Sequence, residues 1–85
     1  MADYRLLIKP SAANELELLP KKLRVRVVGR IGGLASDPRP TGSEKLSGEE
    51  KCRVRQGAYR VVYAVDDVAK TVLVVKIGHR KDVYR

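Results

Sequence analysis

Positively charged residues stand at every second position near the middle of the chain: Lys51, Arg53 and Arg55. In an extended strand, residues two apart point to the same side, so this spacing places three cationic side chains on one face of a sheet. Neighbouring like charges repel one another, and such a face suits a polyanion, above all the phosphates of a nucleic acid. A solvated face without a ligand is the alternative.

Arg60 lies in the next stretch of strand-forming residues. A hairpin between the two strands could bring Arg60 beside Arg55, where a second guanidinium would add the forked donor geometry that fits a phosphate. The sequence does not fix that register, so this pairing stays open.

The end of the chain holds a second group of chemically active side chains. Histidine most readily exchanges a proton near neutral pH, which makes His79 the candidate for proton transfer, although a lone histidine more often packs or forms a structural hydrogen bond. Arg80 can stabilise charge on a phosphoryl group, and Tyr84 can stack on a base. Lys45 and Lys81 join Lys51, Arg53 and Arg55 as candidate RNA-binding residues.

Other catalytic patterns are missing from the sequence. It has no glycine-rich phosphate loop, no cluster of metal ligands and no order of residues that resembles a catalytic triad. We therefore expect neither a cofactor nor a bound metal. The acidic residues Glu44, Glu49, Glu50 and Asp82 are scattered, and we expect each to be solvated.

The chain begins with an alternating pattern over residues 4–9 that predicts a strand. A helix follows, with Ser11 as its N-cap, and Pro20 ends it because proline disfavours a helical residue before it. The spacing of Leu23, Val27, Ile31 and Leu34 predicts a second helix. Residues 23–27 also alternate as a strand would, and three glycines weaken the helix, so that alternative remains.

The second half of the chain changes to extended patterns. Residues 37–48 are rich in proline and glycine and predict a loop, with a short extended piece at residues 45–46. Three strands joined by short turns follow over residues 51–56, 59–65 and 71–77. The fold class is α+β: an N-terminal strand and a two-helix hairpin packed on an antiparallel β-sheet meander, with residues 1–85 as one domain.

Composition limits the kinds of protein that this chain can be. It has 85 residues, 44% of them hydrophobic, and a net charge of +8 from 18 Lys and Arg against 10 Asp and Glu. No apolar run is long enough for a membrane span or a secretion signal, and the single Cys52, expected to be buried, fits a reducing cytoplasm. The positive charge favours nucleic acid as partner, with an acidic protein as the alternative.

The second half of the chain resembles the RelE/ParE superfamily of small type II toxins. The resemblance rests on the segments at residues 46–48, 52–55, 57–63 and 78–84, and family-like prolines at Pro20, Pro38 and Pro40 extend it over nearly the whole chain. Arg80 and Tyr84 favour the RelE branch, which implies a ribosome-dependent endoribonuclease, an mRNA interferase that cuts mRNA in the ribosomal A site without a metal. The ParE branch, which inhibits gyrase, shares the fold.

The resemblance also implies roles for particular residues. Arg53 and Arg55 match positions near the attacking 2′-OH, and Arg60 matches the position that holds the scissile phosphate. Arg80 matches a position that faces the leaving oxygen, and Tyr84 matches one that orients the mRNA. Positions 53 and 55 are often lysine in the family. Because arginine is a poor general base, both arginines would act by electrostatics, and proton transfer would be inefficient unless His79 supplied it.

The resemblance implies partners as well. We expect a cognate acidic, RelB-like antitoxin that wraps the domain, covers the cationic face and displaces the C-terminal residues. The ribosome and mRNA are the expected targets, operator DNA is reached only through the antitoxin, and no membrane is involved. A gyrase-inhibiting toxin without RNase chemistry and an inactive basic RNA-binding module are the competing hypotheses.

Overall fold

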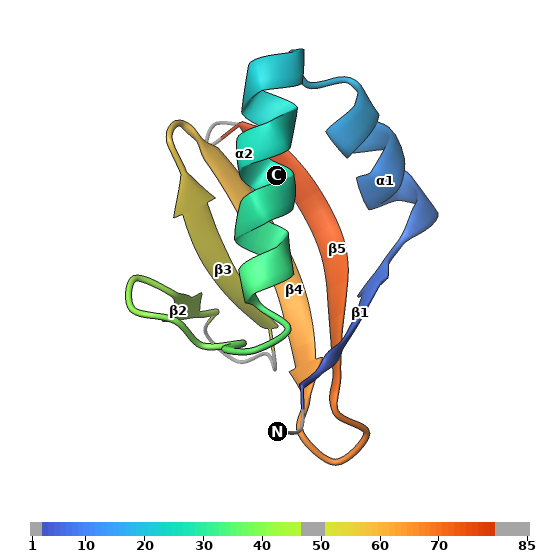
Figure 1. The fold of residues 1–85 in the computed structure, drawn as a ribbon, viewed down its shortest axis with the longest axis vertical. Coiled ribbons are helices and arrows are strands. Elements are labelled where there is room, and N and C mark those ends of the chain that lie inside the picture. The colour runs from blue at the N-terminus through green and yellow to red at the C-terminus, as the bar shows by residue number, and fades with distance from the viewer. Residues whose placement is uncertain (1–2, 47–50, 80–85) are drawn as a thin grey trace.

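The computed structural model describes residues 3–46 and 51–79. The elements follow one another as β1 (Arg5–Ile8), α1 (Pro10–Glu17), α2 (Lys21–Gly33), β2 (Glu44–Lys45), β3 (Lys51–Gln56), β4 (Tyr59–Asp66) and β5 (Thr71–His79). The strands form one sheet in the order β1-β5-β4-β3-β2, and Figure 1 shows α2 lying across this sheet with α1 beside it. The α+β fold class predicted from the sequence is confirmed.

The sheet is mixed because its first strand runs parallel to its last one. Strands β2 to β5 pair antiparallel with their sequence neighbours, which is the predicted meander. Strand β1 lies beside β5 in parallel register, with Arg5 opposite Thr71 and Ile8 opposite Val74. Strand β5 also continues to His79, two residues beyond the predicted end, because its pairing with β4 persists to Tyr59.

A proline lies at or directly before the start of each helix. Proline, not Ser11, starts α1: Lys9 is the N-cap and Pro10 the first helical residue. This differs from the predicted N-cap because a fixed φ and a missing N–H suit proline to the first helical position. Pro20 separates the helices as predicted, since α1 ends at Glu17 and Pro20 caps α2.

The core lies between the helices and the facing side of the sheet. In α2, Val27 and Leu34 are buried, and Leu23 and Ile31 pack against the core half-buried, so the helix prediction is confirmed over the strand alternative. The sheet contributes several fully buried side chains, with Tyr63 the largest and Val54, Val61, Val72, Val74 and Ile77 around it. Cys52 is a buried free thiol, as expected.

The loop between α2 and β2 is anchored to this core. The hydroxyl of Tyr63 donates a hydrogen bond of 2.6 Å to the backbone carbonyl of Pro38, which is itself buried. The extended piece after this loop is β2, one residue earlier than predicted. Among the described residues, no helix is long and apolar enough to cross a membrane.

Candidate nucleic-acid interface

Strand β3 alternates between buried apolar and accessible cationic side chains. Cys52 and Val54 are buried, Lys51 and Arg53 are half-buried, and Arg55 is exposed. The cations therefore share the side of β3 that faces away from the core, as the spacing predicted. We call this side of the sheet the arginine face and define it by Arg53, Arg55 and Arg60.

The β3–β4 hairpin brings Arg55 and Arg60 directly opposite each other. The register left open by the sequence is thereby settled. The turn includes Gly57 at a φ of +62°, a left-handed conformation that glycine adopts at little cost. Directly paired residues of antiparallel strands point to the same face with Cβ atoms about 5 Å apart, so two guanidinium groups start from neighbouring positions. Their repulsion is relieved when an anion binds between them.

A small cavity of about 90 Å³ lies at this place. Gly42, Glu44, Arg53, Arg55 and Arg60 line it. A cavity of this size suits a group as small as a phosphate. Three arginines and one glutamate line this cavity, and their net positive charge favours the binding of an anion.

Glu44 belongs to this cavity and is not simply solvated. Strand β2 pairs with β3 so that Glu44 lies opposite Arg53, whose Nη2 donates a 3.0 Å hydrogen bond to Glu44 Oε2. The Glu44 side chain is 66% exposed, as expected of a solvated carboxylate, and it forms this ion pair in addition. No local pattern signals the contact, because the two residues are nine positions apart and meet only through the pairing of a two-residue strand.

His79 lies on the other side of the sheet. It pairs with Tyr59, and the two rings meet edge to face with centroids 5.5 Å apart. Tyr59 packs against the core, whereas its neighbour Arg60 points the opposite way. The structure thus does not bring His79 together with the arginines, and the residue opposite Arg60 on β5 is Gly78, which has no side chain.

The remaining candidate residues are divided between different places. Lys51 opens the arginine face at the start of β3. Lys45 is exposed but lies opposite Cys52, on the core side of the sheet. Arg80, Lys81 and Tyr84 lie outside the described residues, so the roles that the resemblance implies for them stay predictions. The described residues hold no group of three or more His, Cys, Asp or Glu that could bind a metal.

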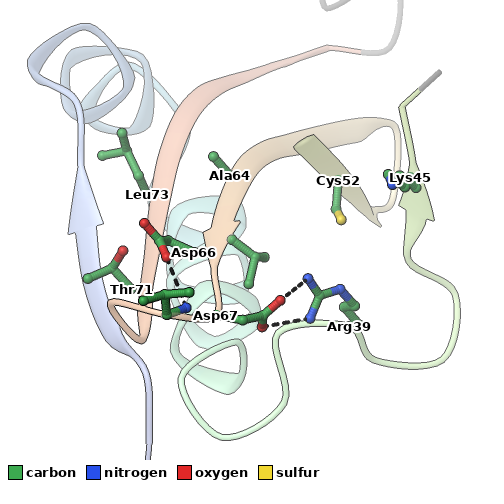
Figure 2. A pocket seen from close by; sticks show the side chains of 10 residues that line it. Arg39, Lys45, Cys52, Ala64, Asp66, Asp67, Thr71 and Leu73 are labelled. Atoms are coloured by element: carbon green, nitrogen blue, oxygen red, sulfur yellow. Dashed lines mark hydrogen bonds and ion pairs between the residues drawn. The ribbon is translucent and has the colours of Figure 1, made fainter. Parts of the chain in front are cut away.

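A larger cavity of about 660 Å³ lies at the opposite end of β3 and β4 (Figure 2). Arg39 points across it to Asp67, with two hydrogen bonds of 3.1 and 3.0 Å, and the hydroxyl of Tyr4 donates another of 2.7 Å to Asp67. The Arg39 guanidinium and the Tyr4 hydroxyl lower the pKa of Asp67 to about 2. Because Asp67 already neutralises Arg39, we interpret this cluster as a structural contact. It joins the N-terminal segment, the loop after α2 and the β4–β5 turn.

Comparison with known proteins identifies the family. The family described as "ParE toxin of type II toxin-antitoxin system, parDE" matches residues 6–84. The chain belongs to this toxin family. It is 31% identical to Toxin RelG of Mycobacterium tuberculosis (strain ATCC 25618 / H37Rv), covering 96% of this chain and 97% of that protein. It is 34% identical to Toxin RelE of the same organism, covering 96% of this chain and 87% of that protein.

Solved structures of family members share the fold. The archaeal RelE of the RelE–RelB complex from Pyrococcus horikoshii OT3 superposes with a TM-score of 0.84 at 29% identity, covering 98% of this chain and all of that one. The isolated RelE toxin of E. coli superposes with a TM-score of 0.80 at 27% identity, covering 95% and 90% of the two chains. The resemblance seen in the sequence is thereby confirmed: this chain is a toxin of the RelE type from a type II toxin–antitoxin system.

Proposed function

We propose that this toxin is a ribosome-dependent endoribonuclease that cleaves translated mRNA in the A site. The observation that supports the proposal is the meeting of Arg53, Arg55 and Arg60 around one cavity of phosphate size. A toxin that acted only by binding gyrase would not need three arginines around a single small cavity.

The proposed reaction is attack of a ribose 2′-OH on the adjacent phosphorus. Negative charge grows on the phosphorane oxygens and on the leaving 5′ oxygen, and arginines placed before the reaction stabilise that charge. By the family resemblance, Arg60 is assigned to the scissile phosphate, and Arg53 and Arg55 to the side of the attacking oxygen. The pairing of Arg55 with Arg60 in the hairpin is compatible with these roles. Removing one such donor costs about 3 kcal/mol, on the order of a hundredfold in rate.

Other parts of the proposal rest on the family resemblance. Arg80 is assigned to the leaving oxygen and Tyr84 to the orientation of the mRNA. Positive charge from arginines takes the place of a metal ion. The placement of His79 beside Tyr59 argues against proton transfer by this residue. The ribosome aligns the mRNA, and alignment of the reacting groups is worth several kcal/mol. Because the ribosome is the proposed target, the toxin acts in the cytoplasm.

A RelB-like antitoxin is the proposed regulator. The RelE relative from Pyrococcus horikoshii was solved as a complex with RelB. The net charge of +8 suits an acidic partner that covers the arginine face, and operator DNA is bound only through that partner.

The test is a cell-free translation reaction with the purified toxin. The 5′ ends of the mRNA are mapped with and without ribosomes, for the natural protein, Arg60→Ala and the control Arg26→Ala on the exposed side of α2. We expect new ends within codons only when ribosomes are present, about a hundredfold slower for Arg60→Ala and unchanged for Arg26→Ala. Intact mRNA with a folded natural protein would refute the proposal.

Gyrase inhibition is the second candidate, because the matching family is described as ParE toxin. A DNA supercoiling assay with purified gyrase tests it directly. Loss of supercoiling, combined with intact mRNA in the translation reaction, would establish this candidate instead.

A further inference from the structure

Among the described residues that line the cavity on the arginine face, one side chain can accept a proton. Arginine is a donor only and stays charged, so Arg53, Arg55 and Arg60 can stabilise anions but cannot remove a proton from a hydroxyl. Gly42 has no side chain. Of the described residues that line the cavity, Glu44 alone carries a side-chain acceptor.

We propose that Glu44 is the general base of the cleavage reaction, an inference that rests on the proposed function. The Glu44 carboxylate takes the proton of the 2′-OH while the 2′ oxygen forms its bond to phosphorus. The bond between phosphorus and the 5′ oxygen then breaks, and the 5′ oxygen takes a proton from water. The products are a 2′,3′-cyclic phosphate and a 5′-hydroxyl end.

The position of Glu44 fits this task. Its side chain is 66% exposed, so a bound RNA can reach it, while strand pairing fixes it opposite Arg53. The 3.0 Å bond to Arg53 engages Oε2, and a carboxylate offers about four acceptor positions in all. Glu44 can therefore keep its contact with Arg53 and accept a hydrogen bond from the attacking hydroxyl. Arg53, whose side chain is only 22% exposed, orients the carboxylate.

The ion pair between Glu44 and Arg53 also allows a second role for Glu44, and the experiment must distinguish it from that of a general base. Glu44 could occupy the position of the substrate phosphate and hold Arg53 back from it. Loss of the carboxylate would then raise activity, whereas loss of a general base lowers it. The two roles therefore predict changes of opposite sign for the same substitution.

The experiment measures single-turnover cleavage of mRNA on saturating programmed ribosomes, from pH 6 to pH 8.5. The variants are Glu44→Gln, Glu44→Asp and Glu44→Ala, and Glu17→Gln at an exposed position of α1 is the control for loss of one negative charge. Thermal unfolding of each variant verifies that it is folded. General base catalysis contributes about 10²- to 10⁴-fold.

We expect Glu44→Gln to lower the rate constant at least a hundredfold and Glu44→Asp to retain part of the activity. The rate of Glu44→Gln should rise about tenfold per pH unit, because hydroxide replaces the lost base, and formate should restore activity to Glu44→Ala. Glu17→Gln should match the natural protein. An unchanged or faster rate for Glu44→Gln, or a slower rate with the pH profile of the natural protein, would overturn the assignment.

Failure of the inference differs from failure of the proposed function. Natural protein that cleaves ribosome-bound mRNA while Glu44→Gln cleaves equally well overturns only the role of Glu44. Natural protein that does not cleave at all overturns the proposed function and the inference together.

Discussion

Replacing Tyr63 by phenylalanine tests the anchor between the sheet and the loop that leads to the arginine face. Tyr63 is 0% exposed, and its hydroxyl donates to the buried Pro38 carbonyl over 2.6 Å. The substitution removes one oxygen and leaves the ring in place, but the carbonyl loses this donor. Leaving a buried acceptor unsatisfied costs about 1 to 3 kcal/mol. At about 4 to 8 °C per kcal/mol for a domain of 60 to 100 residues, we expect a clear fall in the Tm.

The burial of Tyr63 also makes its contribution to stability depend on pH. Burial raises the pKa of Tyr63 from its usual 10 to about 12. The unfolded chain therefore releases this proton first as the pH rises, so the stabilising contribution is complete below pH 10 and is lost between pH 10 and pH 12. Over this range the free energy of unfolding of the natural protein falls by about 1.4 kcal/mol per pH unit, whereas Tyr63→Phe has no such decrease from this position.

Urea unfolding followed by circular dichroism, at pH 8 and at several values above pH 10, measures both effects. Other groups that titrate at alkaline pH are common to the two proteins and cancel in the difference. We expect the deficit of Tyr63→Phe at pH 8 to shrink or reverse by pH 12. Equal stability of Tyr63→Phe and the natural protein at pH 8, with parallel curves above pH 10, would refute the reasoning.

Two further predictions concern contacts that join distant parts of the chain. Arg39 and Tyr4 hold the pKa of Asp67 at about 2, so the stabilisation from this carboxylate is complete above pH 4 and lost as the pH falls toward 2. Acid unfolding should show this loss for the natural protein and not for Asp67→Asn. Glu15 accepts the backbone N–H of Ile77 over 2.9 Å. Glu15→Ala should cost about 1 to 2 kcal/mol and speed hydrogen exchange at Ile77, while Glu15→Gln, which keeps an acceptor, should cost less; equal costs would contradict this role.

Local periodicity predicted the parts of the structure that depend on one element at a time. The alternation of β3 identified which side chains face the core and which form the arginine face, because side-chain direction in a strand depends only on position. In the same way, the spacing of apolar residues from Leu23 to Leu34 determined the buried side of α2, and Pro20 separated the helices.

Contacts between distant segments could not be predicted from local periodicity. The parallel pairing of β1 with β5 joins residues more than sixty positions apart. The end of β5 at His79 depends on how far β4 continues to pair, and that same pairing turns His79 toward Tyr59 and away from the arginines. Glu44 reaches the site through β2, which is too short to leave a periodic signal.

The candidate site combines a rigid part with a less constrained one. Arg55 and Arg60 belong to a continuous hairpin, so the cost of bringing two cations together is met during folding and not during the reaction. Glu44 stands on a two-residue strand that follows Gly42 at a φ of +95°, and the loop before it is anchored to the core by the hydrogen bond of Tyr63. Loss of that anchor should therefore weaken the alignment of Glu44 more than that of the arginines. Tyr63→Phe should lower the cleavage rate of saturated ribosomal complexes while RNA affinity stays unchanged, and a fall in affinity with an unchanged rate would contradict this division of the site.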